Sequence, residues 1–389
     1  MADIKIINNL SETGLDVLRN AGYVISEEEE NPIGILMRSK IIHDYVFNPE
    51  LLAISRSGVG VNNIPVDRCT QEGIAVFNTP GANSNSVKEL TISLMVLIAR
   101  SIVDSMRWVD TLGGIGDDNI KEEVERGKKA FVGPELEGKT LGVIGLGAVG
   151  SKVANAALDL GMTVYGYDPY LSVDAAWKVS KNVQRIESLD ELYPLCDYVT
   201  LHPPLTPETK EMIDAKAIYK MRDGVRLINC ARGGIVNEAD VLAAVDSGKI
   251  AYFASDFPSE ATIGHKNVIL TPHLGGSSEE SEVNCAVMAA QELVEYLKTG
   301  NVKNSVNLPT VSLERMGEAR LCVIHRNVPR MINRFLDLIG DENINVEHMI
   351  NKPSGEIAYT IIDTGSDISE HIRSEIAAMD EVMRVRIIK

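Results

Sequence analysis

Short apolar runs alternate with amphipathic stretches along the first third of the chain. Residues 3–8, 33–39 and 52–58 are apolar runs of the kind that form buried strands, and residues 11–22 have the pattern of a helix that stops at a glycine. Strands that alternate with helices predict a parallel, doubly wound sheet. The apolar stretch at residues 87–109 then predicts one long helix.

A second unit of the same kind begins near Lys139. Its strands are expected at residues 139–145, 162–168, 197–202, 225–230, 250–256 and 267–273, and a helix at about 278–299 closes it. The loops between these elements are rich in turn residues. The pattern therefore predicts an α/β protein with two doubly wound parallel-sheet domains, Rossmann-like or flavodoxin-like.

The pattern changes again towards the end of the chain. Residues 300–314 are polar and have no clear period, so we expect a linker there. From about residue 320 the order is strand, helix, strand, strand, helix, strand. This order predicts a βαββαβ, ferredoxin-like domain at residues 318–389.

The composition of the chain argues against several classes of function. The formal net charge of −17 argues against general nucleic-acid or anionic-membrane binding, since both need a basic footprint. An anionic substrate would then need a local cluster of cations. The five cysteines are scattered and lack metal-ligand spacing, which fits a reducing compartment. With no apolar signal core and no long apolar run, we expect a cytoplasmic protein without a metal site.

The sequence GLGAVG at residues 145–150 follows a predicted strand and opens a predicted helix. Gly145 allows the tight turn, Gly147 lets the backbone approach a pyrophosphate, and Gly150 permits close packing of helix on strand. The helix N-terminus supplies N–H groups for phosphate. Asp168 ends the next strand and can accept a hydrogen bond from a ribose hydroxyl, which favours NAD over NADP.

Three loops after strands of the same sheet carry further polar groups. They hold Arg232, the carboxylates Asp256 and Glu260, and His273. Ligands bind at the carboxyl ends of such strands, so these groups can form one site. Arg232 can clamp a carboxylate, His273 can exchange a proton with a hydroxyl, and a glutamate near the imidazole would stabilise its charged form. The predicted chemistry is hydride transfer to NAD.

These motifs, together with LHPPLTPET at 201–209 and TPHLGGSS at 271–278, resemble the D-isomer-specific 2-hydroxyacid dehydrogenases over about residues 1–310. The resemblance implies a discontinuous substrate-binding domain at 1–97 and 284–309, an NAD-binding domain at 98–283, and a homodimer or homotetramer. The segments MRSK, SRSGVGVNN and NTPGANSNSVKEL resemble members that oxidise D-3-phosphoglycerate, the first step of L-serine biosynthesis.

The resemblance also implies roles for individual residues. The catalytic residues would be Arg232, Glu260 and His273. The cofactor would contact Gly145, Gly147, Ala148, Val149, Gly150, Asp168, His202, Pro203, Cys230, Ala231, Arg232, Asp256, His273, Gly275 and Gly276. The substrate would contact Arg38, Ser39, Arg56, Ser57, Gly58, Asn83, Arg232 and His273.

The chain departs from the family pattern in three of these motifs, and in GVGVNN the departure is Asn62, which stands where an aspartate is common. In DFPSEA, Glu260 lies one residue closer to Asp256 than the family's glutamate does, and a one-residue deletion restores the match. Ala148 stands where the family often has a polar or basic residue. KKAF at 128–131 resembles a segment that reaches into the site of a neighbouring subunit.

The tail resembles an ACT domain, a regulatory module of amino-acid pathway enzymes. The resemblance implies L-serine as an effector bound between two such domains by His325, Asn327 and Asn345, with Arg330 in place of the usual glycine. Alternatively, the tail serves only subunit pairing.

Two further functions stay open. One is the oxidation or reduction of another 2-hydroxy acid on the same scaffold, such as glyoxylate, hydroxypyruvate or D-lactate. The other is a non-enzymatic, NAD-sensing scaffold that binds protein partners; the intact arginine and histidine loops argue against it.

Overall fold

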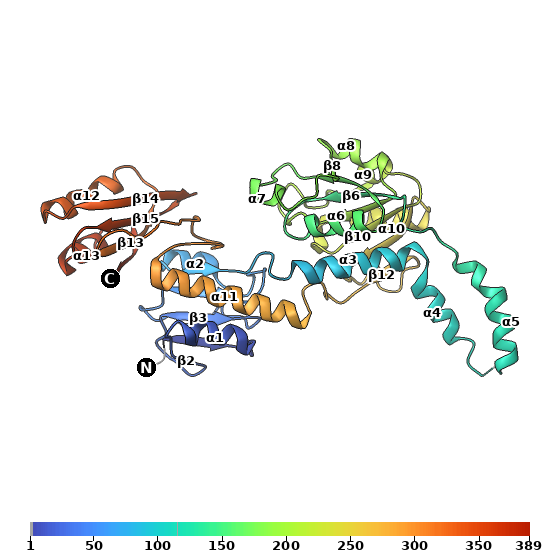
Figure 1. Ribbon diagram of the computed structural model, residues 1–389, viewed down its shortest axis with the longest axis horizontal. Helices are drawn as coiled ribbons and strands as arrows, with labels where there is room; N and C mark the ends of the chain where they lie inside the picture. The colour runs from blue at the N-terminus through green and yellow to red at the C-terminus, as the bar shows by residue number, and fades with distance from the viewer. Residues whose placement is uncertain (1–2, 115) are drawn as a thin grey trace. The chain divides into compact units, whose positions relative to one another are not determined.

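A computed structural model describes residues 3–114 and 116–389 and leaves Met1, Ala2 and Ile115 outside (Figure 1). The chain divides into two compact units, one made of residues up to 82 with 279–389 and the other of residues 83–278. These divisions lie earlier than the expected ones at 97/98 and 283/284. The βαββαβ tail clusters with the first unit because the two share a hydrophobic core.

The first unit contains a parallel sheet in the order β2-β1-β3-β4-β5. Helices α1 and α11 pack on each other, and their contact is so close that a Cβ on Gly14 would lie 2.6 Å from Cβ of Ala286. The elements are β1 (Ile4–Ile7), α1 (Glu12–Asn20), β2 (Ile25–Ser26), β3 (Gly34–Met37), β4 (Ala53–Arg56), α2 (Val66–Gln71), β5 (Ala75–Phe77) and α11 (Glu279–Thr299).

The second unit is built on a parallel sheet in the order β12-β11-β10-β9-β6-β7-β8. This is the doubly wound topology that the sequence predicts, with the order reversing at β6 and β9. The strands are β6 (Thr140–Ile144), β7 (Thr163–Tyr167), β8 (Gln184–Arg185), β9 (Tyr198–Leu201), β10 (Val225–Asn229), β11 (Ile250–Ser255) and β12 (Val268–Leu270). The helices are α3 (Ser84–Ala99), α4 (Ile102–Asp110), α5 (Asp117–Gly127), η1 (Lys128–Phe131), α6 (Gly150–Asp159), α7 (Val173–Ala176), α8 (Leu189–Leu192), η2 (Tyr193–Leu195), α9 (Ala215–Lys220), η3 (Gly233–Ile235) and α10 (Glu238–Asp246).

The expected single helix at 87–109 is wrong in one respect, because it is broken into α3 and α4. Ser101 lies at the break with a φ of 50°, in the left-handed region that ends a helix. Its Oγ lies 2.7 Å from the hydroxyl of Tyr252, a tertiary contact that helical periodicity does not reveal. From this break α4 and α5 extend away from the sheet (Figure 1).

The tail has the predicted βαββαβ order and forms an antiparallel sheet in the order β14-β15-β13-β16. The elements are β13 (Ala319–Arg326), α12 (Met331–Asp341), β14 (Val346–Ser354), β15 (Ile357–Thr364), α13 (Glu370–Ala377) and β16 (Val382–Ile388). Their order confirms the predicted fold class for this part of the chain.

The expected linker at 300–314 is instead packed against the first unit. Val302 and Val311 pair through two backbone hydrogen bonds, and Ser305 bridges to Phe77 on the edge strand β5. Val302, Leu308 and Val311 are buried. The segment has no period because it covers a sheet edge, where buried and exposed positions follow the contour of the neighbours.

Within the described residues, no helix is long and apolar enough to cross a membrane. The same residues contain no group of three or more His, Cys, Asp or Glu side chains that could hold a metal ion.

A fully buried ion pair attaches the tail to the end of α11. Arg320 contacts Asp363 through Nε at 2.6 Å and Nη2 at 2.7 Å, and both side chains are 0% exposed. The remaining donors of Arg320 reach the carbonyls of Thr299 and Leu313. The Tyr359 hydroxyl donates to the Gly300 carbonyl at 2.7 Å. Side chains of the tail therefore satisfy carbonyls at the C-terminal end of α11.

Asp363→Ala should strongly destabilise the first unit, because it leaves the Arg320 guanidinium buried without its carboxylate. We expect a loss of about 3–5 kcal/mol in the free energy of unfolding, measured by chemical denaturation. Asp367→Ala is the control, because its ion pair with Lys389 is exposed and should matter little. Equal effects of the two changes would contradict this assignment.

A second buried acid makes stability depend on pH. Glu292 on α11 accepts a hydrogen bond from Asn304, while its Oε2 is buried without a partner among the described residues. Burial raises the pKa of Glu292 to about 7. Between its ordinary pKa and 7 the folded state holds a proton that the unfolded state releases, so folding stability falls as pH rises.

Glu292→Gln should therefore make the protein more stable than wild type at pH 8, by up to about 3 kcal/mol, because the amide needs no proton. The difference should shrink towards zero at pH 5. The measurement is the free energy of unfolding of both proteins at the two pH values, and a difference independent of pH would count against the raised pKa.

Candidate active site

The GLGAVG turn between β6 and α6 has the geometry that close packing requires. Gly145 has a φ of +89°, and a Cβ there would lie 2.8 Å from the carbonyl carbon of His202. A Cβ on Gly150 would lie 1.8 Å from the Gly145 oxygen, so only glycine fits. A Cβ on Gly147 would meet nothing within 4 Å. The turn thus leaves open space at the position where a pyrophosphate is expected.

Asp168 follows β7 beside this turn. Its carboxylate accepts hydrogen bonds from the N–H of Leu146 at 2.8 Å and of Tyr170 at 2.9 Å. It also lines a cavity of about 430 Å³ together with Gly166 and Lys181. Each carboxylate oxygen keeps a second lone pair, so Asp168 can hold the turn and still accept from a ligand hydroxyl.

His202 and Cys230, which follow β9 and β10, are both uncharged near neutral pH. The ring of His202 lies 3.0 Å from the Thr200 hydroxyl, and burial lowers the pKa of His202 to about 3. Burial raises the pKa of the Cys230 thiol to about 12. Pro203 follows His202 directly. These side chains therefore add no charge to this edge of the sheet.

A buried amide holds the loop of Arg232. Asn229, the last residue of β10, donates to the Arg232 carbonyl at 2.8 Å and accepts from the Ala231 N–H at 3.1 Å. The Arg232 side chain is exposed, with one hydrogen bond to the Ala231 carbonyl. Sequence reasoning missed Asn229, although an asparagine between a strand and a reactive loop is typical of such side-chain to backbone bonds.

Asp256 fixes the loop of His273. Its buried carboxylate accepts from the Thr271 hydroxyl at 2.5 Å, the Leu274 N–H at 2.8 Å and the Gly275 N–H at 2.7 Å. His273 lies between these contacts with a φ of 57°, a conformation that a histidine adopts only when its surroundings hold it. Its exposed ring lies 5.0 Å from that of Phe257. Asp256 thus positions His273 as well as lying among the expected cofactor contacts.

Glu260 is exposed at the start of a turn after β11. Among residues 3–114 and 116–389, no hydrogen bond or ion pair joins it to His273. The neighbouring Ser259 bonds instead to Glu238 and Thr262. The structure therefore does not bring the expected supporting carboxylate onto the imidazole, and that role stays a prediction.

Arg38 and Ser39, two of the expected substrate residues, lie on a loop held by two asparagines. Asn8 accepts from the backbone N–H groups of Arg38, Ser39 and Lys40. Asn63 donates to the carbonyls of Arg38 and Lys40. Sequence reasoning missed both asparagines, and the Asn-Asn pair that follows β1 was the only local signal.

Arg56 lies next to this loop and donates from Nε to the Arg38 carbonyl at 2.9 Å. A Cβ on Gly58 would lie 2.8 Å from the Arg56 guanidinium, so glycine makes room for it. Ser57 is buried beside them, and the Thr79 hydroxyl accepts from the Gly58 N–H. Asn83 belongs to the second unit, where its side chain lies against Gly276.

A family model described as "D-isomer specific 2-hydroxyacid dehydrogenase, NAD binding domain" matches residues 92–275. A putative D-3-phosphoglycerate dehydrogenase of Schizosaccharomyces pombe is 33% identical over 93% of this chain and 82% of its own. The D-3-phosphoglycerate dehydrogenase of Haemophilus influenzae is 30% identical over 98% and 96%. The chain belongs to the D-isomer-specific 2-hydroxyacid dehydrogenases.

This dehydrogenase also resembles solved structures. The NAD⁺-bound 3-phosphoglycerate dehydrogenase of Entamoeba histolytica is 26% identical, with a TM-score of 0.61 over 79% of this chain and 99% of that one. A Synechocystis D-3-phosphoglycerate dehydrogenase is 34% identical over 82% of this chain, but the chain spans only 58% of its length. The family confirms NAD as the cofactor and the doubly wound fold expected from sequence.

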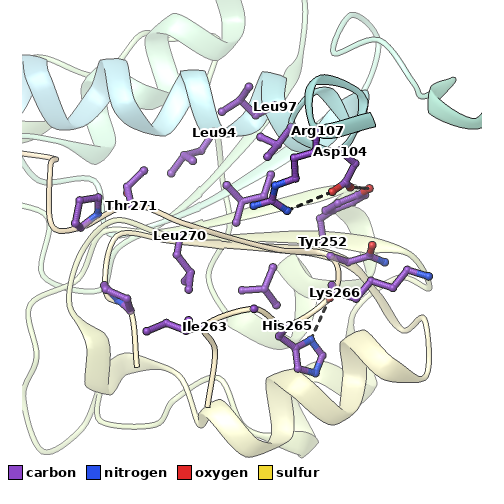
Figure 2. A pocket seen from close by; sticks show the side chains of 17 residues that line it. Leu94, Leu97, Asp104, Arg107, Tyr252, Ile263, His265, Lys266, Leu270 and Thr271 are labelled. Atoms are coloured by element: carbon purple, nitrogen blue, oxygen red, sulfur yellow. Dashed lines mark hydrogen bonds and ion pairs between the residues drawn. The ribbon is translucent and has the colours of Figure 1, made fainter. Parts of the chain in front are cut away.

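A cavity of about 690 Å³ lies elsewhere on the second unit, beside the edge strand β12 (Figure 2). Leu94 and Leu97 of α3 and Tyr252 line it, and two of its charged side chains, Asp104 and Arg107 of α4, pair with each other at 3.7 Å. It contains neither Arg232 nor His273. The dehydrogenase chemistry therefore does not belong to this cavity.

Asp256→Asn should lower kcat on the order of 10- to 100-fold while the melting temperature changes little. The amide loses at least one bond to the loop N–H groups, so His273 is no longer held in its left-handed conformation. Steady-state kinetics and a thermal melt measure the two effects. A variant with wild-type kcat would show that the carboxylate does not position His273.

Proposed function

We propose that this dehydrogenase oxidises D-3-phosphoglycerate to 3-phosphohydroxypyruvate with NAD⁺, the first step of L-serine biosynthesis. The observation that carries the proposal is that Arg38, in the loop after β3, and Arg56, the last residue of β4, lie next to each other on an otherwise acidic protein. Two guanidiniums suit a phosphate and a carboxylate. Relatives that match over most of their length and are named for this activity support it.

The proposed cofactor site is the carboxyl edge of the second unit's sheet. NAD⁺, when bound, supplies the hydride acceptor. The N–H groups at the start of α6 suit the pyrophosphate, and the open space at Gly147 fits its approach. Asp168 accepts from the ribose hydroxyls and repels a 2′-phosphate. The remaining expected contacts are Ala148, Val149, His202, Pro203, Cys230, Ala231, Arg232, Asp256, His273, Gly275 and Gly276.

The proposed chemistry uses one proton acceptor and one cation. His273 takes the proton of the C2 hydroxyl as the hydride leaves C2, so NADH and one proton are formed. Arg232 binds the carboxylate and polarises the reacting oxygen. Glu260 stabilises the imidazolium that forms, which requires the turn at residues 260–264 to bring its carboxylate to the ring.

His273→Ala should reduce kcat with D-3-phosphoglycerate by at least about 100-fold and leave NAD⁺ binding nearly intact, because it removes the proton acceptor alone. The assay follows NADH absorbance with D-3-phosphoglycerate, D-glycerate, glycolate and D-lactate as separate substrates. Near-normal turnover of the variant would overturn the assignment of His273.

The same panel decides between the substrates. Wild-type kcat/KM should be highest for the phosphorylated acid. A higher value for an unphosphorylated acid would identify another 2-hydroxyacid dehydrogenase, and no NADH with any of them would favour an NAD-binding scaffold.

We also propose that the protein is a homo-oligomer, with a dimer or tetramer as the expected states. Helices α4 and α5 and the short η1 helix contain no buried residue among those described, yet Met106, Val109 and Val132 are large exposed apolar side chains in this region. Such a surface is typical of a subunit contact.

The tail is proposed to act as an ACT-like regulatory or pairing domain. His325 is buried, with both ring nitrogens bonded within the chain and its pKa lowered by burial. His325 and Asn327 lie at one end of the sheet and Asn345 at the other. An L-serine site that uses all three therefore requires two tail domains, and turnover with and without L-serine tests it.

A further inference from the structure

One of the two substrate-side arginines is already paired with a carboxylate of the chain. The Nη2 atom of Arg38 lies 2.5 Å from Oε1 of Glu282, in the first turn of α11. The Arg38 side chain is 38% exposed and that of Glu282 is 47% exposed. The ion pair is therefore formed at the surface, where a dissolved anion can reach it.

The guanidinium of Arg56, in contrast, is not paired with a carboxylate of the described residues. Its Nε is used to hold the Arg38 carbonyl, whereas its two terminal nitrogens have no hydrogen-bond partner in the described part of the chain. These two neighbouring residues thus present one guanidinium with free donors for an anion and one that is already paired with a carboxylate of the chain.

We propose that Glu282 lowers the affinity of the phosphate site, because it pairs with Arg38 when no substrate is bound and is displaced from Arg38 by the phosphate of the substrate. This proposal rests on the proposed function and names a residue of the chain that tunes how tightly Arg38 binds the phosphate.

The weakness of the ion pair makes displacement feasible. Exposed ion pairs contribute about 0–1 kcal/mol, so Glu282 imposes a small, fixed cost on any anion that binds Arg38. A phosphate monoester carries about −1.5 to −2 charges and three acceptor oxygens, against one charge on a carboxylate. The phosphate therefore displaces Glu282 more readily than a second carboxylate does.

Glu282 stays charged throughout the assay range. The hydrogen bond from Arg38 lowers the pKa of Glu282 below its ordinary value. Above neutral pH the competition at Arg38 is therefore between two anions, and the protonation of Glu282 does not relieve it.

Glu282→Gln should lower the KM for D-3-phosphoglycerate about two- to fivefold, the equivalent of a weak surface pair, and leave kcat unchanged. The KM for D-glycerate should not change, because that substrate has no phosphate to place on Arg38. A raised KM for D-3-phosphoglycerate would overturn the proposal, since it would show that Glu282 supports Arg38 in binding.

Glu280→Gln is the matched control. Glu280 lies in the same first turn of α11, is exposed, and has no ion pair among the described residues. Glu280→Gln removes one negative charge, as Glu282→Gln does, and it removes the same favourable interaction of a carboxylate with the dipole at the N-terminus of α11. If Glu280→Gln and Glu282→Gln changed the KM for D-3-phosphoglycerate equally, the cause would be a general charge effect, and the proposal would be wrong.

A double mutant tests whether Glu282 acts through Arg38. Arg38→Ala alone should raise the KM for D-3-phosphoglycerate far more than that for D-glycerate. In the Arg38→Ala background, Glu282→Gln should have no further effect on KM. If Glu282→Gln still changed the KM in the Arg38→Ala background, Glu282 would not act through Arg38, and the proposal would be wrong.

Calorimetric binding of inorganic phosphate separates this proposal from the proposed function. Glu282→Gln should bind phosphate two- to fivefold more tightly than wild type, and the gain should vanish in the Arg38→Ala background. This result supports the competition at Arg38 even if D-3-phosphoglycerate is not oxidised. Equal phosphate affinities of wild type and Glu282→Gln overturn it.

Discussion

The parallel alignment of the strands from β12 to β8 is the constraint on which the proposed chemistry depends. Since neighbouring strands run in the same direction, every loop that follows a strand emerges at the same edge of the sheet. The glycine turn, Asp168, Arg232 and His273 are far apart in sequence but all follow strands of this sheet. An antiparallel sheet would send alternate loops to opposite edges.

Buried polar side chains hold the exposed reactive ones. Asp256 fixes the loop of His273, Asn229 fixes that of Arg232, and Asn63 helps to fix that of Arg38. These supporting residues bond to the backbone of each loop and do not bond to the side chains of Arg38, Arg232 or His273. Such an arrangement positions a group without consuming its own donors or acceptors.

Helix α11 connects two different features of the first unit. At its C-terminal end its carbonyls accept hydrogen bonds from Arg386, Arg320 and Tyr359 of the tail, and at its first turn Glu282 pairs with Arg38. A helix of 21 residues spans about 30 Å. The tail is thereby attached to the same helix that carries Glu282.

The sequence by itself determined the elements, the two sheet types and the residues at the strand ends, because periodicity and glycine spacing are local. It also led to the family through its motifs. It failed at Ser101, at residues 300–314 and at Asn8 and Asn63, because their conformations follow from partners distant in the chain. It also missed Asn229, although the hydrogen-bond partners of this residue are only two and three residues away. Only the tertiary structure decided that Arg38 is paired with Glu282 and that Glu260 is not bonded to His273, since side-chain pairing depends on packing that no spacing encodes.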